Sequence, residues 1–528
     1  MSGPPLTTFT WLAAATPVLC LLIAVVTGWL SARLAAALVL ALACISGAVV
    51  YGAGLSVLAV AVGKGLWLGT WILGVVWPAL LLYGVASSVG LERIGRVFTS
   101  VLPGRAETLL LLAWVFPSFL QGVAGFGTPI AVCAPLLVAA GWTPARAVAY
   151  PLIGYHWSVT FGSMGSSFYM AALTAHLGAG EQTDLAFAAS SLLAMQCMVS
   201  GMLVLAMDGG WTAVREGSRM LLAVGLPMAG VLIGVATTVP AVASLAAGTA
   251  GLVGVVALSF VDHRRRAVTV GDVPAPTVVA PTPDTPDAGR SLQMLAPYMF
   301  LLITALPIFL VPASRAWVLD HVVVAPDFPA TSTAAGWSNA AVENYTPFPV
   351  FGHPGFYVAL ATMLGYLTYR ASGLWSGGAA TVRAWARSLP GASLPILLLA
   401  ALATVMADTG MVSVLARGIA QVTGAAYPAL APTIGGLGSF MTGSTTTSNA
   451  LFAGLQADVA ALLGVDPVVL LAAQTAGGNI GNALAPVVAL VGLTTVGTPS
   501  ELSHVARRSL PPALVLFAVA AAVTVLRS

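Results

Sequence analysis

Long apolar runs alternate with short polar or glycine-rich stretches along almost the whole chain. Many runs are about 20 residues long, the length that an α-helix needs to cross the hydrocarbon core of a bilayer. The pattern therefore predicts an all-α polytopic membrane protein. The expected apolar helices cover residues 10–29, 35–57, 65–89, 108–120, 129–140, 146–175, 185–206, 221–240, 242–260, 294–312, 355–369, 388–422, 427–441, 448–463, 467–496 and 511–526.

Several of these segments are too short for a simple span or are split by Gly, Pro or Ser clusters, and three such irregularities occur twice. The members of each pair are separated by about 320 residues. The pairs are Gly90 with Gly410, Gly125 with Gly443, and Gly162 with Gly481. The recurrence predicts an internal repeat, with re-entrant hairpins at 108–141 and 427–463 and broken helices at 146–175, 388–422 and 467–496.

Two polar stretches suggest how the chain is divided. Residues 262–292 are rich in Pro, Thr and Asp, which predicts a flexible cytoplasmic linker between a first membrane half, 1–261, and a second, 293–528. Residues 313–354 are expected to form an extracellular loop. Arginines gather at the cytoplasmic ends of membrane helices, which puts the N-terminus outside. The two hairpins then enter from opposite sides, so the repeat is inverted.

The hairpin tips are rich in glycine and hydroxyl groups. Irregular backbone within a membrane is tolerated only where it is buried in protein or lines a cavity, and paired breaks of this kind indicate a transporter's binding site. The N-terminus of a half-helix offers free N–H groups and about half a positive charge, so a carboxylate needs no buried lysine or arginine. The predicted substrate-binding residues are Gln121, Gly125, Gly127, Thr128, Ser163, Gly443, Ser444, Thr445, Thr446, Thr447, Ser448, Asn449 and Asn479.

Two structural explanations for these tips remain open. The glycines could serve only to let helices pack closely, as small residues do in membranes. The serines and threonines of 442–448 could serve only to cap the following helix, with Thr447 or Ser448 as its N-cap.

Four sequence blocks are distinctive: Ser-Phe-Leu-Gln-Gly-Val-Ala-Gly-Phe-Gly-Thr-Pro at 118–129, Phe161 to Gly165, Met207-Asp208-Gly209, and 436–456 with its Gly-Ser-Thr-Thr-Thr-Ser-Asn core, followed by Gly477-Gly478-Asn479. In order and spacing these blocks resemble the bacterial lactate permease family, which also covers glycolate uptake. The resemblance implies a secondary active transporter of the bacterial inner (plasma) membrane. It would import lactate, glycolate or a related small 2-hydroxy-monocarboxylate by proton symport. The alternative is a channel or a carrier for another anion, such as a dicarboxylate or sulfate.

Three positions depart from the family's better-known members. Those members carry acidic residues where this chain has Gln121 and Thr445, and a lysine where it has Asn482. Losing opposite charges together avoids a buried unpaired ion. The departures leave the coupling ion open between a proton and sodium.

Ionisable residues within membrane segments are functional candidates. Asp408, beside Thr409-Gly410 at a predicted break, and His156, six residues before Gly162, are the proton-coupling candidates. Their structural alternatives are a helix cap and a packing histidine. Lys64 is expected to extend to the membrane interface, and Asp208 is expected to be structural, near Arg215.

Composition supports a membrane protein and excludes several other classes. Hydrophobic residues make up 58% of the chain and charged residues 7%, against about 25% charged in soluble proteins. The single lysine and scattered arginines argue against a nucleic-acid partner, and the four cysteines have no metal or disulfide spacing. No catalytic or cofactor motif is present, so no enzyme activity, cofactor or metal is expected. The expected partners are the carboxylate, the proton and the bilayer, with a homo-oligomer left open.

Overall fold

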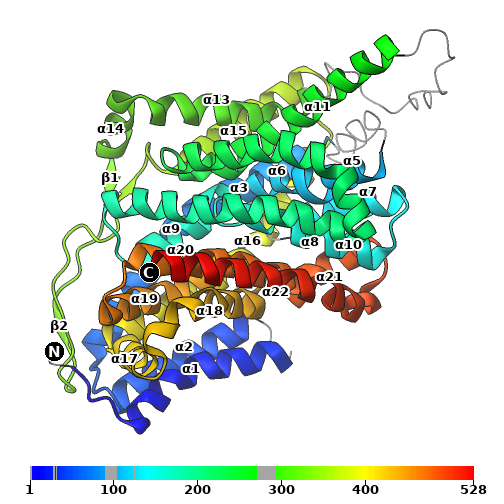
Figure 1. Cartoon of the computed structure of the whole chain (residues 1–528). Coiled ribbons are helices and arrows are strands. Elements are labelled where there is room, and N and C mark those ends of the chain that lie inside the picture. The colour runs from blue at the N-terminus through cyan, green and yellow to red at the C-terminus, as the bar shows by residue number, and fades with distance from the viewer. Residues whose placement is uncertain (1–2, 28–29, 31, 90–103, 124–126, 270–292) are drawn as a thin grey trace.

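The computed structural model describes residues 3–27, 30, 32–89, 104–123, 127–269 and 293–528. It is mostly helical, and its helices run side by side in one slab (Figure 1). Within these described residues, five helices are long and apolar enough to cross a membrane, or up to seven if each of two bent pairs is one span. The five are α3 (Leu55–Ser87), α10 (Ala179–Ala236), α11 (Ala243–Thr269), α16 (Gly378–Asp408) and α22 (Leu502–Arg527).

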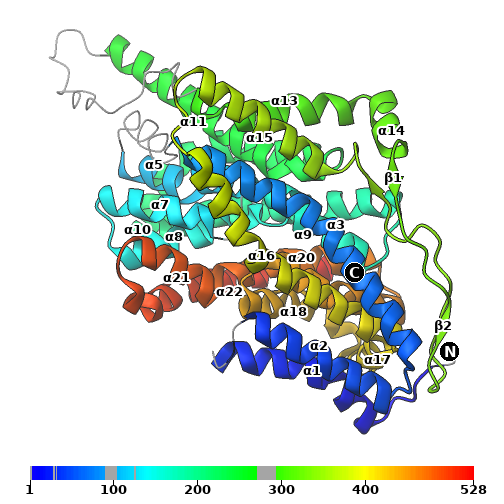
Figure 2. The same cartoon turned by 180° about the vertical axis from the view of Figure 1, so that it is seen from behind.

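The helices α3 and α16 cross each other at the back of the molecule (Figure 2). A Cβ atom on Gly65 would lie only 2.3 Å from the Cα of Ala401, so glycine is what allows the two backbones to approach. The pair α1 (Thr8–Thr27) and α2 (Ala32–Val49) flanks α16. The pair α13 (Ala296–Leu310) and α15 (Pro354–Ala371) flanks α3 on the opposite edge.

The 58-residue helix α10 is two antiparallel arms. A straight helix of that length would extend about 87 Å, yet its first and last residues line one cavity. The reversal occurs at Gly209 and Gly210, the second of which has φ 63°. Glycine adopts that left-handed conformation without the Cβ clash that other residues meet.

Two helical hairpins and two broken helices fill the centre. The first hairpin joins α5 (Arg105–Leu110), a π-helical turn and α6 (Phe116–Val123) to α7 (Thr128–Ala139), and the second joins α18 (Tyr427–Thr442) to α19 (Thr445–Leu463). One broken helix is α8 (Pro144–Tyr155), the short turns η2 (His156–Ser158) and η3 (Ser163–Gly165), and α9 (Ser166–Thr174). The other is α20 (Pro467–Leu484) with α21 (Pro486–Thr495), bent by 43°.

The segment predicted as a loop at 313–354 contains regular structure. The helix α14 (Pro312–Asp320) opens it, at 98° to α13. The strand β1 (Val323–Val324) pairs with β4 (Phe348–Pro349), and β2 (Thr331–Ser332) pairs with β3 (Ser338–Asn339), both antiparallel. The all-α prediction missed these strands because two residues are too few to show the alternation that marks a strand. The helix α11 also continues to Thr269, past the predicted start of the linker at 262.

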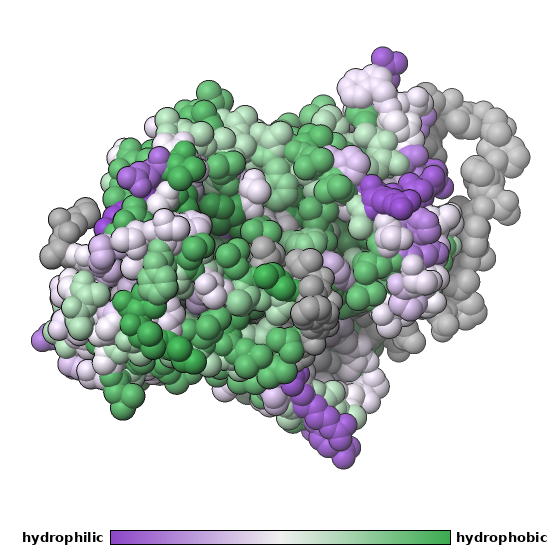
Figure 3. All heavy atoms as spheres, turned by 90° about the horizontal axis from the view of Figure 1, so that it is seen from below, coloured by the Kyte–Doolittle hydropathy of each residue, from purple (hydrophilic) through white to green (hydrophobic). Residues whose placement is uncertain are grey.

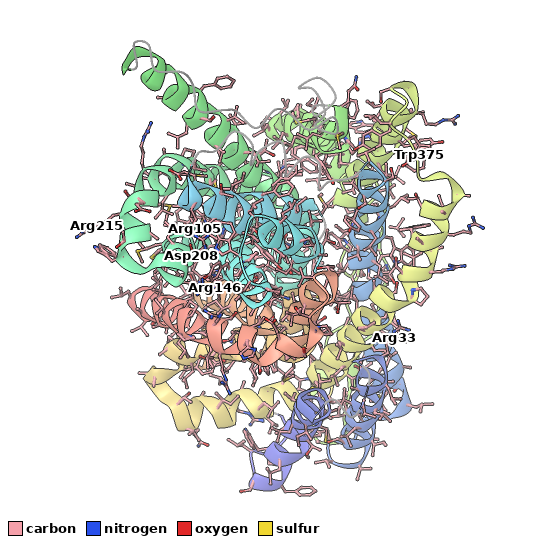
Figure 4. All side chains as sticks on the ribbon, turned by 90° about the vertical axis from the view of Figure 1, so that its right-hand side faces the viewer. Arg33, Arg105, Arg146, Asp208, Arg215 and Trp375 are labelled. Carbon is pink, nitrogen blue, oxygen red and sulfur yellow. The ribbon has the colours of Figure 1, made fainter. Side chains whose placement is uncertain are left out.

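The two ends of the slab differ in charge. Arg33, Arg105, Arg146 and Arg215 all lie at one end, which we call the basic end (Figure 4). Both chain termini and the paired strands lie at the other, which we call the opposite end (Figure 1). Hydrophobic residues cover most of the face in Figure 3, and its strongest hydrophilic patch lies toward the basic end.

Candidate functional site

A small cavity of about 30 Å³ lies where the hairpins and broken helices meet. We call it the central cavity. The tips of both hairpins reach it, and both tips pack on α21, Gly127 against Val491 and Gly443 against Val487. Those two valines are about one helical turn apart. The lining residues are Gln121, Gly127, Tyr155, Val159, Ser163, Ser166, Ser167, Gly443, Ser444, Thr445, Thr446 and Asn482.

Three helices begin at this cavity. Gly127 (φ 83°) precedes α7, Gly165 (φ 71°) precedes α9, and Ser444, after Gly443 (φ 68°), precedes α19. The first N–H groups of a helix have no carbonyl partner within it, and each N-terminus carries about half a positive charge. The central cavity therefore favours an anion although no charged side chain among the described residues lines it.

Hydrogen bonds fix the tip of the second hairpin. The Ser444 Oγ accepts from the Thr447 N–H at 3.3 Å, so Ser444 caps α19. The prediction that Thr447 or Ser448 is the N-cap is wrong, because the helix begins at Thr445 and both residues lie inside its first turn. The Ser448 hydroxyl instead donates to the Gly435 carbonyl at 2.7 Å. The helix-capping explanation therefore accounts for only one of these hydroxyls.

Other tip residues connect the second hairpin to the broken helices. The Thr446 hydroxyl lies 3.2 Å from the Ser166 hydroxyl and 2.9 Å from that of Ser167, at the start of α9. The Asn482 Nδ2 donates to the Gly443 carbonyl at 2.7 Å. The chain segments around the central cavity are thus tied together by neutral polar contacts.

Among the lining residues, Gln121 has a side-chain amide that is free to bind a ligand. The residue is only 4% exposed, and its side chain makes no hydrogen bond with the described residues. Gly162 lies against it, and a Cβ there would come within 2.8 Å of the Gln121 Nε2. Buried polar groups are normally hydrogen-bonded, so a buried amide with this surrounding is suited to binding a ligand.

Five predicted residues lie outside the lining of the central cavity, and Gly125 lies outside the described residues. Asn449 donates to the Ser167 carbonyl (2.9 Å) and to Thr475 Oγ1 (3.0 Å), and Asn479 accepts from Thr160 Oγ1 (3.1 Å). They form a buried polar layer that supports the lining residues. The remaining three are Thr128, Thr447 and Ser448.

Asp408 lies away from the central cavity, at the end of α16. Its Oδ2 is 2.9 Å from the Lys64 Nζ, and the two residues are 9% and 6% exposed. The prediction that Lys64 extends to the interface is wrong, because Asp408 provides a buried counter-charge. The next helix, α17 (Met411–Thr423), is preceded by Gly410, so Asp408 is not its N-cap.

His156 is fully buried and its two ring nitrogens have partners. The Nδ1 lies 2.8 Å from the Ile153 carbonyl, and the Nε2 lies 3.2 Å from the Gln196 Oε1. Rotating the Gln196 amide by 180° would let its otherwise unpartnered Nε2 donate to a neutral imidazole. This geometry favours the packing alternative for His156.

Asp208 accepts two hydrogen bonds from Arg105, at 2.9 and 3.0 Å, and one from the Trp142 Nε1 at 2.9 Å. The expected neighbour, Arg215, is not its ion-pair partner. The contact joins the start of the first hairpin to the break in α10 at the basic end (Figure 4).

Sequence reasoning missed five lining residues as binding candidates. They are Tyr155, Val159, Ser166, Ser167 and Asn482. The two serines had a usable signal, because they directly follow the Gly162–Gly165 break and are therefore the first residues of a new half-helix.

Comparisons with known proteins agree with the motifs at the hairpin tips. The L-lactate permease of Escherichia coli K12 is 29% identical over 496 residues, which cover 88% of this chain and 85% of the relative. The glycolate permease GlcA of the same strain is 26% identical over 503 residues, with the same coverage. Among solved structures, the YdaH transporter of Alcanivorax borkumensis has a TM-score of 0.47 and 16% identity, covering 88% of this chain and 86% of that one.

The sequence profile described as L-lactate permease matches residues 10–528, nearly the entire chain. The chain therefore belongs to the L-lactate permease family, as the hairpin-tip motifs predicted, and is a multi-pass membrane transporter rather than an enzyme.

Proposed function

We propose that this protein imports lactate or a related small 2-hydroxy-monocarboxylate, such as glycolate, by proton symport across the bacterial plasma membrane. The observation that carries the proposal is the meeting of three helix N-termini at one neutral, hydroxyl-lined cavity. Relatives named L-lactate permease and glycolate permease, each matching most of the chain, support this substrate class.

The carboxylate would be bound by the first N–H groups of α7 and α19, because helix N-termini bind anions without a buried cation. The Gln121 amide and the Ser163 hydroxyl, which line the same cavity, would bind the 2-hydroxyl. The central cavity has room for about two water molecules, which is close to the size of one carboxylate group. A small acid therefore suits it better than a large one.

The proposed architecture is an inverted repeat of two re-entrant hairpins, each followed by a broken helix. The basic end would face the cytoplasm, because arginines gather on that side of membrane proteins, and the opposite end would face outward. With this orientation both termini lie outside.

Asp408 is our proposed proton carrier. It is a carboxylate buried between the two crossing helices, held by Lys64. Protonation would remove its charge and weaken the Lys64 contact, which joins α3 to α16. A proton taken up there would thus change a contact between the two halves of the chain.

Proteoliposomes holding the purified protein test the proposal. We expect a proton gradient directed into the vesicles to drive accumulation of labelled L-lactate, D-lactate or glycolate. We expect a sodium gradient at constant pH to drive no accumulation. Accumulation driven by sodium alone would overturn proton coupling. Absence of gradient-driven uptake for all three acids would overturn the substrate assignment.

A further inference from the structure

A second, larger cavity of about 290 Å³ lies at the opposite end of the slab. We call it the outer cavity, and it has almost ten times the volume of the central cavity. Its walls come from α3, α9, both ends of α10, α13, α14 and the start of α15. Most of its lining is apolar or aromatic, including Trp71, Phe168, Leu173, Leu301, Phe309 and Tyr357.

Arg315 is the one charged residue among the described residues that line the outer cavity. It is exposed, and it makes no ion pair or side-chain hydrogen bond with the described residues. It also lines a neighbouring cavity of about 280 Å³, so it lies at the boundary between the two. Tyr169 lines the outer cavity together with Arg315. A guanidinium beside an apolar cavity suits an anion that carries an apolar body.

The turn Ser163–Gly165 contributes residues to the lining of both the outer and the central cavity. Met164 lines the outer cavity, and its neighbour Ser163 lines the central one. Both residues have left-handed backbone, with φ 46° for Ser163 and 58° for Met164. That conformation costs about 1–2 kcal/mol per non-glycine residue, so the turn is held by its surroundings and not by its own preference. A strained turn thus lies next to both the outer cavity and the proposed transport site.

We propose that the outer cavity is a second binding site for monocarboxylates, in which Arg315 binds the carboxylate before the anion reaches the central cavity. The proposal rests on the proposed function, because it adds a binding site that the substrate occupies before it reaches the central cavity. The difference in volume between the two cavities determines which ligands each of them can hold. A monocarboxylate with an aromatic body fits the outer cavity but not the central one, so it binds from this side without being carried.

Phenyllactate, a 2-hydroxy-monocarboxylate with an aromatic body, is the probe. Its binding to the purified protein is measured by calorimetry, independently of transport, for the wild type and for Arg315→Gln. We expect the substitution to weaken phenyllactate binding about fivefold or more, the effect of losing one exposed charge-assisted contact. Arg527→Gln is the matched control, because Arg527 lies at the same end and lines neither cavity. Equal affinity in the wild type and Arg315→Gln would overturn the proposal.

Uptake kinetics give a second readout, measured separately from each side of oriented proteoliposomes. We expect Arg315→Gln to raise the KM for lactate about fivefold from the opposite end only, with the maximal rate and the KM from the basic end unchanged. An arginine that only anchors α14 at the bilayer surface would leave both KM values unchanged. A wild-type protein that binds phenyllactate but transports no lactate would overturn the proposed function and leave the site itself supported.

Labelling an introduced cysteine after the protein has folded tests the location of the site without changing how much folded protein is made. Thr183 is exposed and lines the outer cavity. Once Thr183→Cys protein is reconstituted, we expect a bulky thiol reagent to block phenyllactate binding and phenyllactate to slow the labelling. Wild-type protein with the same reagent controls for its own four cysteines. Full phenyllactate binding after complete labelling would contradict the proposed location.

Discussion

Lys64 and Asp408 form a buried ion pair of 2.9 Å although 344 residues separate them in the sequence. The pair joins α3 of the first half to α16 of the second. A side chain from the paired-strand segment also contacts Asp408, because the Asn339 Nδ2 donates to the Asp408 main-chain carbonyl at 2.8 Å. The only lysine in the chain is thus used to balance a buried carboxylate.

Asp408→Asn is expected to weaken gradient-driven lactate accumulation more than lactate counterflow, because counterflow requires no net proton movement. The substitution also leaves Lys64 buried without its counter-charge, which costs about 3–5 kcal/mol. The double variant Lys64→Gln with Asp408→Asn removes both charges and is expected to restore the amount of folded protein without restoring accumulation. Both activities are measured in proteoliposomes. Wild-type accumulation in the double variant would exclude Asp408 as the proton carrier.

Gly443→Leu is expected to abolish transport while the protein still reaches the membrane. Gly443 has φ 68°, and a Cβ there would lie 2.3 Å from the Val487 Cγ1. A side chain would therefore push the hairpin tip away from α21 and open the central cavity. Uptake and the amount of folded protein are measured together.

Gly464 provides a matched control at the other end of the same helix. It has nearly the same backbone conformation, φ 69°, but no atom lies within 4 Å of its Cβ position. Gly464→Leu thus has the same backbone cost without the clash, and we expect it to transport normally. Equal loss of folded protein in both variants would show that the conformation of Gly443, and not its place at the tip, is what matters.

The glycine and hydroxyl cluster at 442–449 could be located from sequence because its signal is local. Left-handed turns favour glycine, and Gly443 lies at the break between α18 and α19. Family membership followed from the same motif and is confirmed by the profile match. Several tip residues that the motif pointed to, including Ser444 and Thr446, line the central cavity.

Side-chain contacts between residues far apart in the sequence could not be predicted from such local motifs. Helical periodicity shows which residues share a face of one helix but not which other helix they meet. The sequence placed Asp208 near Arg215 but gave no sign of Arg105, which is its ion-pair partner. Lys64 was expected to reach water for the same reason, because nothing near it in the sequence signals Asp408.

The Asp208 contact is expected to stabilise the fold without affecting substrate binding. Asp208→Ala removes acceptors from Arg105 and from the buried Trp142, and we expect it to lower the free energy of unfolding by about 1–3 kcal/mol. Arg215→Gln is expected to change nothing, since Arg215 is exposed and is not the ion-pair partner. Thermal unfolding in detergent compares the variants, and the KM for lactate is expected to remain within twofold of wild type in both. A raised KM in Asp208→Ala at unchanged stability would contradict a purely structural role.

Gln121→Leu is expected to affect binding without affecting stability. The Gln121 amide lines the central cavity and makes no hydrogen bond with the described residues, so an apolar side chain of similar size leaves no protein group unsatisfied. A ligand that used the amide would lose one hydrogen bond, and we expect the KM for lactate to rise about tenfold, or about 1.4 kcal/mol.

Gln456→Leu is the contrasting variant, because Gln456 is a buried glutamine whose amide is fully used. It accepts from the Tyr427 hydroxyl at 2.8 Å and donates to the Ala431 carbonyl at 3.1 Å and to the Gln474 Oε1 at 2.9 Å. Its loss leaves buried groups unpaired, which costs about 1–3 kcal/mol for each group, so we expect a lower melting temperature. The KM of the protein that remains folded should be unchanged. If Gln121→Leu instead lowered the melting temperature and left the KM unchanged, Gln121 would be a packing residue and the proposed binding role would be wrong.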